Sequence, residues 1–313
     1  MDIRKYFNYS IFCFIFCLTT TLAEARGPLD LATAVVPPGA QHIIYGSDPL
    51  QVGELRLPAT QGPHPVAIVI HGGCWAAKLG NWDPRSIAMD NMRPLAAALT
   101  KQGIATWNVE YRRLDNPGGG WPGTFQDIAD ATDVLRTLSK QYSLDLTRVV
   151  VIGHSAGGHL AFWSAARPNL AKTSELYTSK PLLLKGAINL DGPANLKAVF
   201  VHQQAICNRP VMTELMGGSP EAQSQRYQDA SPIELLPLRV AQMYFVSQKL
   251  VDHATQYAEA AEKSGDKIKV FIFPTASHFD FIDPEAETWP SILAGVQQLL
   301  SNNQAESKQL ILQ

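Results

Sequence analysis

The sequence contains little cysteine and almost no net charge. It has 4 cysteines among 313 residues, and its 26 lysines and arginines nearly balance its 28 aspartates and glutamates. With a formal net charge of -2, the chain lacks the basic field that would attract nucleic acid or an anionic membrane surface. We therefore expect no nucleic-acid partner, and a binding role driven by charge is excluded.

The apolar run near the N-terminus, residues 11–18, is shorter than the roughly 20 residues that a bilayer span requires. Arg4 and Lys5 precede this run, and the small-residue sequence Ala-Glu-Ala at 23–25 follows it. This order is typical of a secretory signal peptide, although an N-terminal anchor or a first helix is the alternative. We expect cleavage after Ala25, export to the periplasm or the medium, and no stable membrane insertion afterwards.

Removal of a signal peptide leaves two cysteines, Cys74 and Cys207. Two cysteines cannot form a disulfide scaffold, so the apolar core has to stabilise the fold. The exported compartment permits a bridge between them, and a free, buried Cys74 in a small position is the alternative.

Short apolar runs alternate with helical segments along the remaining chain, which is 46% hydrophobic overall. Runs bounded by Gly or Pro predict strands that are buried on both faces, as in a parallel sheet, at residues 65–71, 104–110, 148–153, 184–190, 241–246 and 267–273. Helical patterns are found at residues 86–102, 124–142, 155–166, 254–264 and 288–300. The alternation predicts an α/β fold with a doubly wound, mostly parallel sheet, and shorter edge strands at 42–45 and 50–57. The Pro-rich residues 192–238 interrupt it, and we expect a small cap insertion there rather than an ordinary long connection.

Residues 153–157 read Gly-His-Ser-Ala-Gly and lie between a Val-rich strand and an Ala-rich helix. The G-x-S-x-G pattern in this setting is typical of a sharp strand-to-helix turn that exposes a nucleophilic serine. A serine hydroxyl is a poor nucleophile unless a base is within reach. The motif therefore predicts Ser155 as the catalytic nucleophile, with a structural turn as the alternative.

Residues 71–75 read His-Gly-Gly-Cys-Trp and follow the strand at 65–71. A Gly-Gly turn can direct successive backbone amides at one oxygen, which a tetrahedral intermediate requires. We expect the amides of Gly73, Cys74 and Ala156 to form the oxyanion hole. Trp75 either packs under this loop or lines the acyl pocket, and His71 braces the loop rather than acting as a base.

These two motifs resemble those of the HGGxW branch of the α/β-hydrolases. That branch includes kynurenine-formamidase-like and feruloyl-esterase-like enzymes and is related to hormone-sensitive-lipase-like esterases. The resemblance extends from about Tyr45 to Leu300 and implies a sheet of about eight strands and no metal or organic cofactor. It also implies that Gly73 and Cys74 supply the oxyanion hole. We therefore expect residues 1–25 to be a signal peptide and residues 26–313 to be an α/β-hydrolase domain with a cap at about 192–238.

The general base is predicted to be His278, which follows the last predicted strand in the order serine, acid, histidine. The acid is less clearly marked, because residues 246–253 lack the glycine that the resembled family usually carries in the turn after the penultimate strand. Asp252 is the only carboxylate before the next helix and is our expected acid. Asp280 and Asp191 are its rivals.

Together these residues predict a serine hydrolase that cleaves carboxylic esters through an acyl-enzyme. An arylformamidase, an amidase or an exopeptidase on the same residues is the alternative, and a non-catalytic binding protein is the alternative of another class. The partner is then a small-molecule ester or amide, and we expect Trp75, His154 and Trp121 to contact it. Oligomeric state is not predicted.

Overall fold

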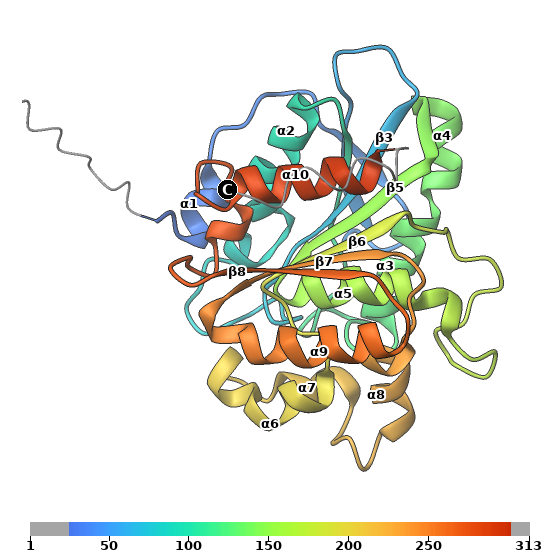
Figure 1. The fold of residues 1–313 in the computed structure, drawn as a ribbon, viewed down its shortest axis with the longest axis vertical. Coiled ribbons are helices and arrows are strands. Elements are labelled where there is room, and N and C mark those ends of the chain that lie inside the picture. The colour runs from blue at the N-terminus through green and yellow to red at the C-terminus, as the bar shows by residue number, and fades with distance from the viewer. Residues whose placement is uncertain (1–24, 302–313) are drawn as a thin grey trace, which may run out of the picture.

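The computed structural model describes residues 25–301 and confirms the predicted fold, an eight-stranded, mostly parallel sheet with helices on both faces (Figure 1). The predicted signal peptide lies outside the described residues except for Ala25. The strands are β1 (Gln41–Ile44), β2 (Val52–Arg56), β3 (His64–Ile70), β4 (Ala105–Val109), β5 (Leu144–His154), β6 (Gly186–Leu190), β7 (Ala241–Ser247) and β8 (Ile268–Phe273).

The sheet has the strand order β1-β2-β4-β3-β5-β6-β7-β8. β1 pairs antiparallel with β2, and β2 pairs antiparallel with β4, whereas the strands from β4 to β8 pair in parallel. The central strands are buried on both faces, which explains their continuous apolar sequences. In a parallel sheet the carboxyl ends of neighbouring strands meet at one edge, and side chains that follow β5, β6 and β8 therefore come together there.

Two layers of helices cover the sheet (Figure 1). One face is covered by α1 (Pro28–Thr33), α2 (Arg93–Lys101) and α10 (Trp289–Leu300), and the other by α3 (Gly123–Asp133), α4 (Leu135–Tyr142), α5 (Ala156–Ala166) and α9 (Val251–Lys263). Every residue of α5 is buried, so this helix is the centre of its layer. Short 3₁₀ helices join these elements: η1 (Pro84–Ile87), η2 (Met89–Met92), η3 (Arg167–Asn169), η4 (Pro232–Leu235), η5 (Gln248–Leu250) and η6 (Asp280–Ile282).

Two predicted helices differ in extent from the observed ones. The segment 86–102 begins as 3₁₀ turns, and the α-helix starts only at Arg93, immediately before Pro94. Proline is tolerated in the first turn of a helix but not in its interior, which fixes that start. The segment 124–142 is two helices, α3 and α4, that meet at Val134.

Residues 192–238, which we call the cap, lie between β6 and β7 and are more regular than their proline content suggests. They contain α6 (Leu196–Cys207), α7 (Val211–Met216), α8 (Ser224–Ala230) and η4. The helices lie together beside α9, at the bottom of Figure 1. Asn195 caps α6 by accepting hydrogen bonds from the backbone amides of Lys197 and Ala198.

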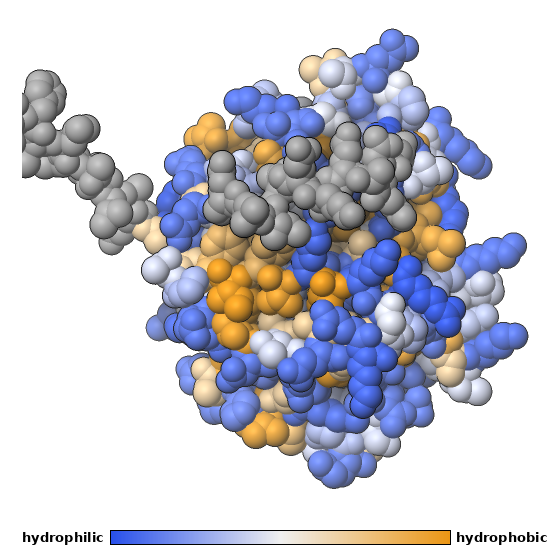
Figure 2. All heavy atoms as spheres, in the orientation of Figure 1, coloured by the Kyte–Doolittle hydropathy of each residue, from blue (hydrophilic) through white to orange (hydrophobic). Residues whose placement is uncertain are grey.

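The surface is mixed in polarity (Figure 2). Apolar side chains gather over β8 in this view, where the edge strand is only partly covered and Ile272 is 48% exposed. Among residues 25–301, no helix combines the length and the apolar character that crossing a membrane requires.

Candidate active site

Ser155 lies on a strained turn between β5 and α5. Its backbone has φ 54° and ψ -121°, a conformation that side-chain-bearing residues rarely adopt. The turn closes only because glycine follows: a Cβ on Gly157 would lie 2.2 Å from the carbonyl oxygen of Ile70. The backbone amide of Ser155 donates to the carbonyl of Leu190 at 2.8 Å, which fixes the turn to the end of β6.

The loop after β3 runs directly beside this serine. A Cβ on Gly72 would lie 2.9 Å from the Cβ of Ser155, so only glycine permits this approach. The next residues, Gly73 and Cys74, both have positive φ, at 104° and 52°, and both line the same cavity as Ser155 and Ala156. The three residues expected to supply oxyanion-hole amides therefore surround one cavity together with the serine.

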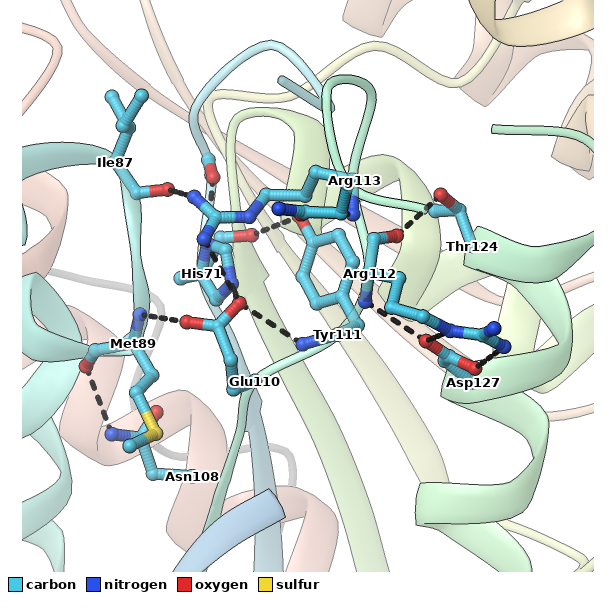
Figure 3. A network of polar contacts seen from close by, with 12 residues as sticks. His71, Ile87, Met89, Asn108, Glu110, Tyr111, Arg112, Arg113, Thr124 and Asp127 are labelled. Carbon is cyan, nitrogen blue, oxygen red and sulfur yellow. Dashed lines mark hydrogen bonds and ion pairs between the residues drawn. The ribbon is translucent and has the colours of Figure 1, made fainter. Parts of the chain in front are cut away.

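A buried ionic network holds this loop in place (Figure 3). The carboxylate of Glu110 accepts hydrogen bonds from Nε2 of His71 at 3.0 Å and from the backbone amides of Met89 and Tyr111. Burial opposes ionisation of Glu110, but His71 and Arg113 outweigh it and lower its pKa to about 2. His71 is fully buried, and its Nδ1 lies 2.7 Å from the carbonyl oxygen of Gly72. This geometry agrees with the expected bracing role of His71.

Cys74 and Cys207 form a disulfide, with their Cα atoms 6.0 Å apart. Of the two interpretations that the sequence left open, the bridge is therefore the observed one. It ties the loop after β3 to the last residue of α6 in the cap. Two residues further along, Arg209 forms an ion pair with Asp115 and donates to the carbonyl of Lys78, which adds a second tie between the same parts.

His278 follows β8, and the acid that contacts it is Asp191. Oδ2 of Asp191 lies 2.6 Å from Nδ1 of His278, and Asp191 is 2% exposed. Ser247, at the end of β7, donates to the same carboxylate from its amide at 2.8 Å and from its hydroxyl at 3.0 Å. Burial opposes ionisation of Asp191, but these hydrogen bonds outweigh it and hold its pKa below the usual value. Asp191 is thus an ionised acceptor that fixes the ring of His278.

The expectation that Asp252 orients His278 is wrong. After β7 the chain passes through η5 directly into α9, so Asp252 is in the first turn of that helix and is exposed. Asp280, the other rival, accepts hydrogen bonds from the amide and hydroxyl of Ser277 and does not contact His278. Asp191 follows β6 and reaches His278, which follows β8, across the end of β7, where Ser247 donates to the same carboxylate.

A cavity of about 710 Å³ joins these groups. Ser155, His278 and Asp191 line it on one side, and the cap contributes Val199 and Ile206. Further residues that line it include Leu79, Asn81, Trp82, Ser86, Ile87, Asn91, Arg209, Leu250, His253 and Phe279. The cavity is therefore mostly apolar, with the candidate nucleophile and base at its wall.

Of the three residues expected to contact the substrate, two line the cavity. Trp75 and His154 line the cavity, but both are buried. Burial lowers the pKa of His154 to about 3, and its Nε2 donates to the carbonyl of His278 at 2.8 Å, so this ring supports the turn that carries His278. Trp121 is not among the lining residues: its indole donates to Glu175 and lies against Phe125, so the structure does not bring it to this cavity with Trp75 and His154.

The arrangement can support nucleophilic catalysis. It has a serine on a strained turn, a histidine fixed by a buried carboxylate, and a glycine loop beside the serine, which are the parts of a serine hydrolase site. Within residues 25–301, no group of three or more His, Cys, Asp or Glu side chains is placed to hold a metal ion.

A family model supports this interpretation. The model described as BD-FAE matches residues 54–257, more than half of the chain. The match includes the glycine loop, the serine turn, Asp191 and the whole cap, and it ends before His278. The predicted resemblance to the HGGxW branch of the α/β-hydrolases agrees with this match.

Curated relatives are mostly esterases. A probable isoprenylcysteine alpha-carbonyl methylesterase of Oryza sativa subsp. japonica is 22% identical, over 85% of this chain and 64% of the relative. Esterase LipC of Mycobacterium tuberculosis is 24% identical over 80% of this chain and 62% of its own. Kynurenine formamidase avaC of Aspergillus versicolor is 34% identical over 38% of this chain and 41% of its own. The chain spans less than two thirds of the length of these relatives.

Solved structures share the fold. Esterase B from Lactobacillus rhamnosis has a TM-score of 0.69 at 20% identity, with 87% of this chain and 89% of that chain covered. An acetyl ester-xyloside bifunctional hydrolase from Caldicellulosiruptor lactoaceticus has a TM-score of 0.66 at 19% identity, over 85% of this chain and 98% of that chain.

Proposed function

Because this chain belongs to the BD-FAE family of α/β-hydrolases, we propose that it is a serine hydrolase that cleaves carboxylic esters through an acyl-enzyme. The observation that carries the proposal is the hydrogen bond of 2.6 Å between the buried Asp191 and His278, in a cavity that also contains Ser155. The esterase names of the relatives support the same class of reaction.

In this proposal His278 is the general base. Its Nδ1 carries a proton that is donated to the ionised Asp191, which leaves Nε2 unprotonated and able to accept the proton of the Ser155 hydroxyl. The Ser155 oxygen then attacks the ester carbonyl, and the alcohol leaves with the proton that His278 returns. Water repeats the sequence on the acyl-enzyme and releases the acid.

The oxyanion of each tetrahedral intermediate is held by backbone amides. We assign Gly73, Cys74 and Ala156 this role, because all three line the cavity beside Ser155. The positive φ angles of Gly73 and Cys74 distinguish this part of the loop from extended backbone, and the Glu110 network and the disulfide keep it fixed. Preorganised donors of this kind stabilise charge that develops in the transition state.

A substrate panel tests the proposal. Short and long p-nitrophenyl esters and feruloyl esters should be hydrolysed by the wild-type protein, and Ser155→Ala should lower kcat by about 10⁴ or more while the fold is retained. Near-normal turnover in folded Ser155→Ala would refute the assignment of the nucleophile.

A formamide is the second candidate substrate class, because one relative is named a kynurenine formamidase. The same serine, histidine and oxyanion donors can cleave an amide bond. N-formylkynurenine and aminoacyl anilides therefore belong in the panel. A kcat/KM for N-formylkynurenine above that of every ester would replace the ester assignment by this one.

We propose further that the protein is exported. The charged start, apolar run and small-residue end of residues 1–25 support this, and so does the Cys74–Cys207 disulfide, because cytosolic thiols are normally kept reduced. Protein recovered from the periplasm or the medium should begin at Arg26. Uncleaved protein that stays in the cytoplasm would refute export.

A further inference from the structure

Trp82 is an exposed aromatic side chain that lines the active-site cavity. It is 49% exposed, so a ligand in the cavity can reach its ring. Trp75, the other tryptophan of the cavity wall, is only 2% exposed, and its indole donates to His159 at 3.1 Å. Of these two rings, Trp82 is therefore the one that is available to a substrate.

Aromatic rings lead from the candidate general base to Trp82. Phe279 directly follows His278 and lines the same cavity, and the centroids of these two rings lie 5.3 Å apart. The rings of Phe279 and Trp82 are also neighbours, with centroids 6.1 Å apart and planes inclined at 46°. Trp82 and Phe279 thus form an aromatic wall that begins beside His278.

The backbone that carries Trp82 is held on both sides. Its amide donates to the carbonyl of Leu79 at 3.0 Å, which closes a turn before it. Asp83, the next residue, caps η1 by accepting a hydrogen bond from the amide of Arg85 at 2.9 Å. A ring on a backbone that is already ordered can select a ligand by shape, because binding then costs little chain entropy.

The proposed reaction brings the alcohol part of the ester to this wall. The backbone amides of the oxyanion hole hold the carbonyl oxygen, and His278 returns a proton to the departing alcohol oxygen. That oxygen has to lie within hydrogen-bond reach of His278. The group attached to it therefore extends from His278, where Phe279 and Trp82 line the cavity.

The rest of the lining suits an uncharged group. It includes the aliphatic side chains of Leu79, Ile87 and Ile206. Asp191 is the one carboxylate residue among the cavity-lining residues of the described chain, and it is engaged by His278. A cation, which a tryptophan face also attracts, would therefore find no free counter-ion in this cavity.

We infer that Trp82, together with Phe279, is a specificity-determining residue that packs against an aromatic ring in the alcohol part of the ester. The preferred substrate is then an ester of an uncharged alcohol that carries an aryl group. Aromatic rings attract one another beyond the area that they bury, and an aliphatic ring of similar size lacks this gain. The inference rests on the proposed ester hydrolysis and adds the class of alcohol to it.

Two acetate esters test the inference. Benzyl acetate and cyclohexylmethyl acetate share their acyl group and differ in whether the ring of the alcohol is aromatic. The ratio of their kcat/KM values should be about fivefold lower in Trp82→Leu than in the wild type, which corresponds to about 1 kcal/mol. Trp82→Phe should keep most of the wild-type ratio. Comparison of the ratios cancels the difference in intrinsic reactivity between the two esters.

Ile206→Ala is the matched control, because Ile206 lines the same cavity and is equally exposed at 49% but is not aromatic. It should leave the ratio at the wild-type value even if kcat/KM falls for both esters. A second pair, ethyl phenylacetate and ethyl cyclohexylacetate, carries the ring in the acyl part. Trp82→Leu should leave the ratio of this pair unchanged.

The inference is overturned if Trp82→Leu keeps the wild-type ratio for the acetates, or if it changes the ratio of the acyl pair instead. An equal fall in kcat/KM for every ester would also overturn it, because Trp82 would then only support the shape of the site. Failure of the proposed function looks different: no ester is hydrolysed and Ser155 does not react with a serine probe.

Discussion

Replacement of Asp191 by asparagine should change which ring nitrogen of His278 carries the proton. Oδ1 of Asp191 faces the backbone amide of Ser247 at 2.8 Å, and Oδ2 faces Nδ1 of His278 at 2.6 Å. In Asp191→Asn the amide oxygen is expected to remain on the Ser247 amide, which turns the NH₂ group toward Nδ1. Nδ1 must then be the acceptor, and the proton moves to Nε2, where it blocks acceptance of the Ser155 proton.

The expected loss is large because nearly all molecules adopt the wrong tautomer. We expect kcat to fall by up to about 10⁴, equivalent to about 5.5 kcal/mol of transition-state stabilisation. KM should change much less, since Asp191 is engaged by His278 and Ser247 and is 2% exposed.

The assay is steady-state hydrolysis of a p-nitrophenyl ester at neutral pH, with circular dichroism to confirm the fold. Asp252→Asn is the matched control, because Asp252 is exposed on α9 and should leave kcat unchanged. Wild-type kcat/KM in Asp191→Asn, together with loss of activity in Asp252→Asn or Asp280→Asn, would refute the reasoning.

Three further perturbations test the supports of the site. Glu110→Gln should lower the free energy of unfolding at neutral pH. The pKa of Glu110 is lowered from 4.5 to about 2 in the folded protein, so its ionised carboxylate contributes about 3 kcal/mol to the free energy of unfolding above pH 4.5. This contribution is lost as the pH falls toward 2. Urea unfolding at pH 7 and pH 3 measures this, and a wild-type advantage that does not shrink at pH 3 contradicts it. Cys207→Ser should lower the free energy of unfolding by about 2–5 kcal/mol, and reductant should lower the wild-type Tm but not that of the variant. Two free thiols in unfolded, unreduced protein that lacks residues 1–25, and with them Cys13 and Cys17, would reject the Cys74–Cys207 bridge. Gly72→Ala should lower kcat by about 10² with the fold intact, because its new Cβ would displace the loop from Ser155; unchanged kcat would show that the loop does not supply the oxyanion donors.

The fold was predictable because its signals are local. Continuous apolar runs bounded by glycine and proline identify the buried parallel strands β3, β5 and β6, and the segment after β5 reads as a helix. Ser155 was found for the same reason, since its strand, turn and helix are consecutive in the sequence. The predicted bounds are least accurate for the helices at 86–102 and 124–142. In the first, the α-helix starts only at Arg93, just before a proline, and in the second the apolar pattern is divided between α3 and α4.

The acid of the site was not predictable in the same way, because it depends on geometry between strands. The sequence places Asp252 after β7, where a carboxylate is expected, but it cannot show that the chain passes through η5 directly into α9 and leaves Asp252 in the first turn of that helix. Ser247 was the available signal: a hydroxyl residue at the end of β7, with Asp191 directly after β6, allows the carboxylate to be held across the intervening strand.

Trp121 shows the same limit for the cavity. Trp121 was expected at the substrate because it is aromatic and in a glycine-rich loop, but it packs on Phe125 and bonds to Glu175. Which side chains line a cavity is a property of the folded chain.

Labelling with a fluorophosphonate probe tests the central claim most directly, because such a probe reacts with an activated serine and needs no knowledge of the substrate. Folded wild-type protein should incorporate one probe molecule, with the modified peptide containing Ser155, and Ser155→Ala should incorporate none. Folded wild-type protein that stays unlabelled, or a label on a different serine, would contradict the account.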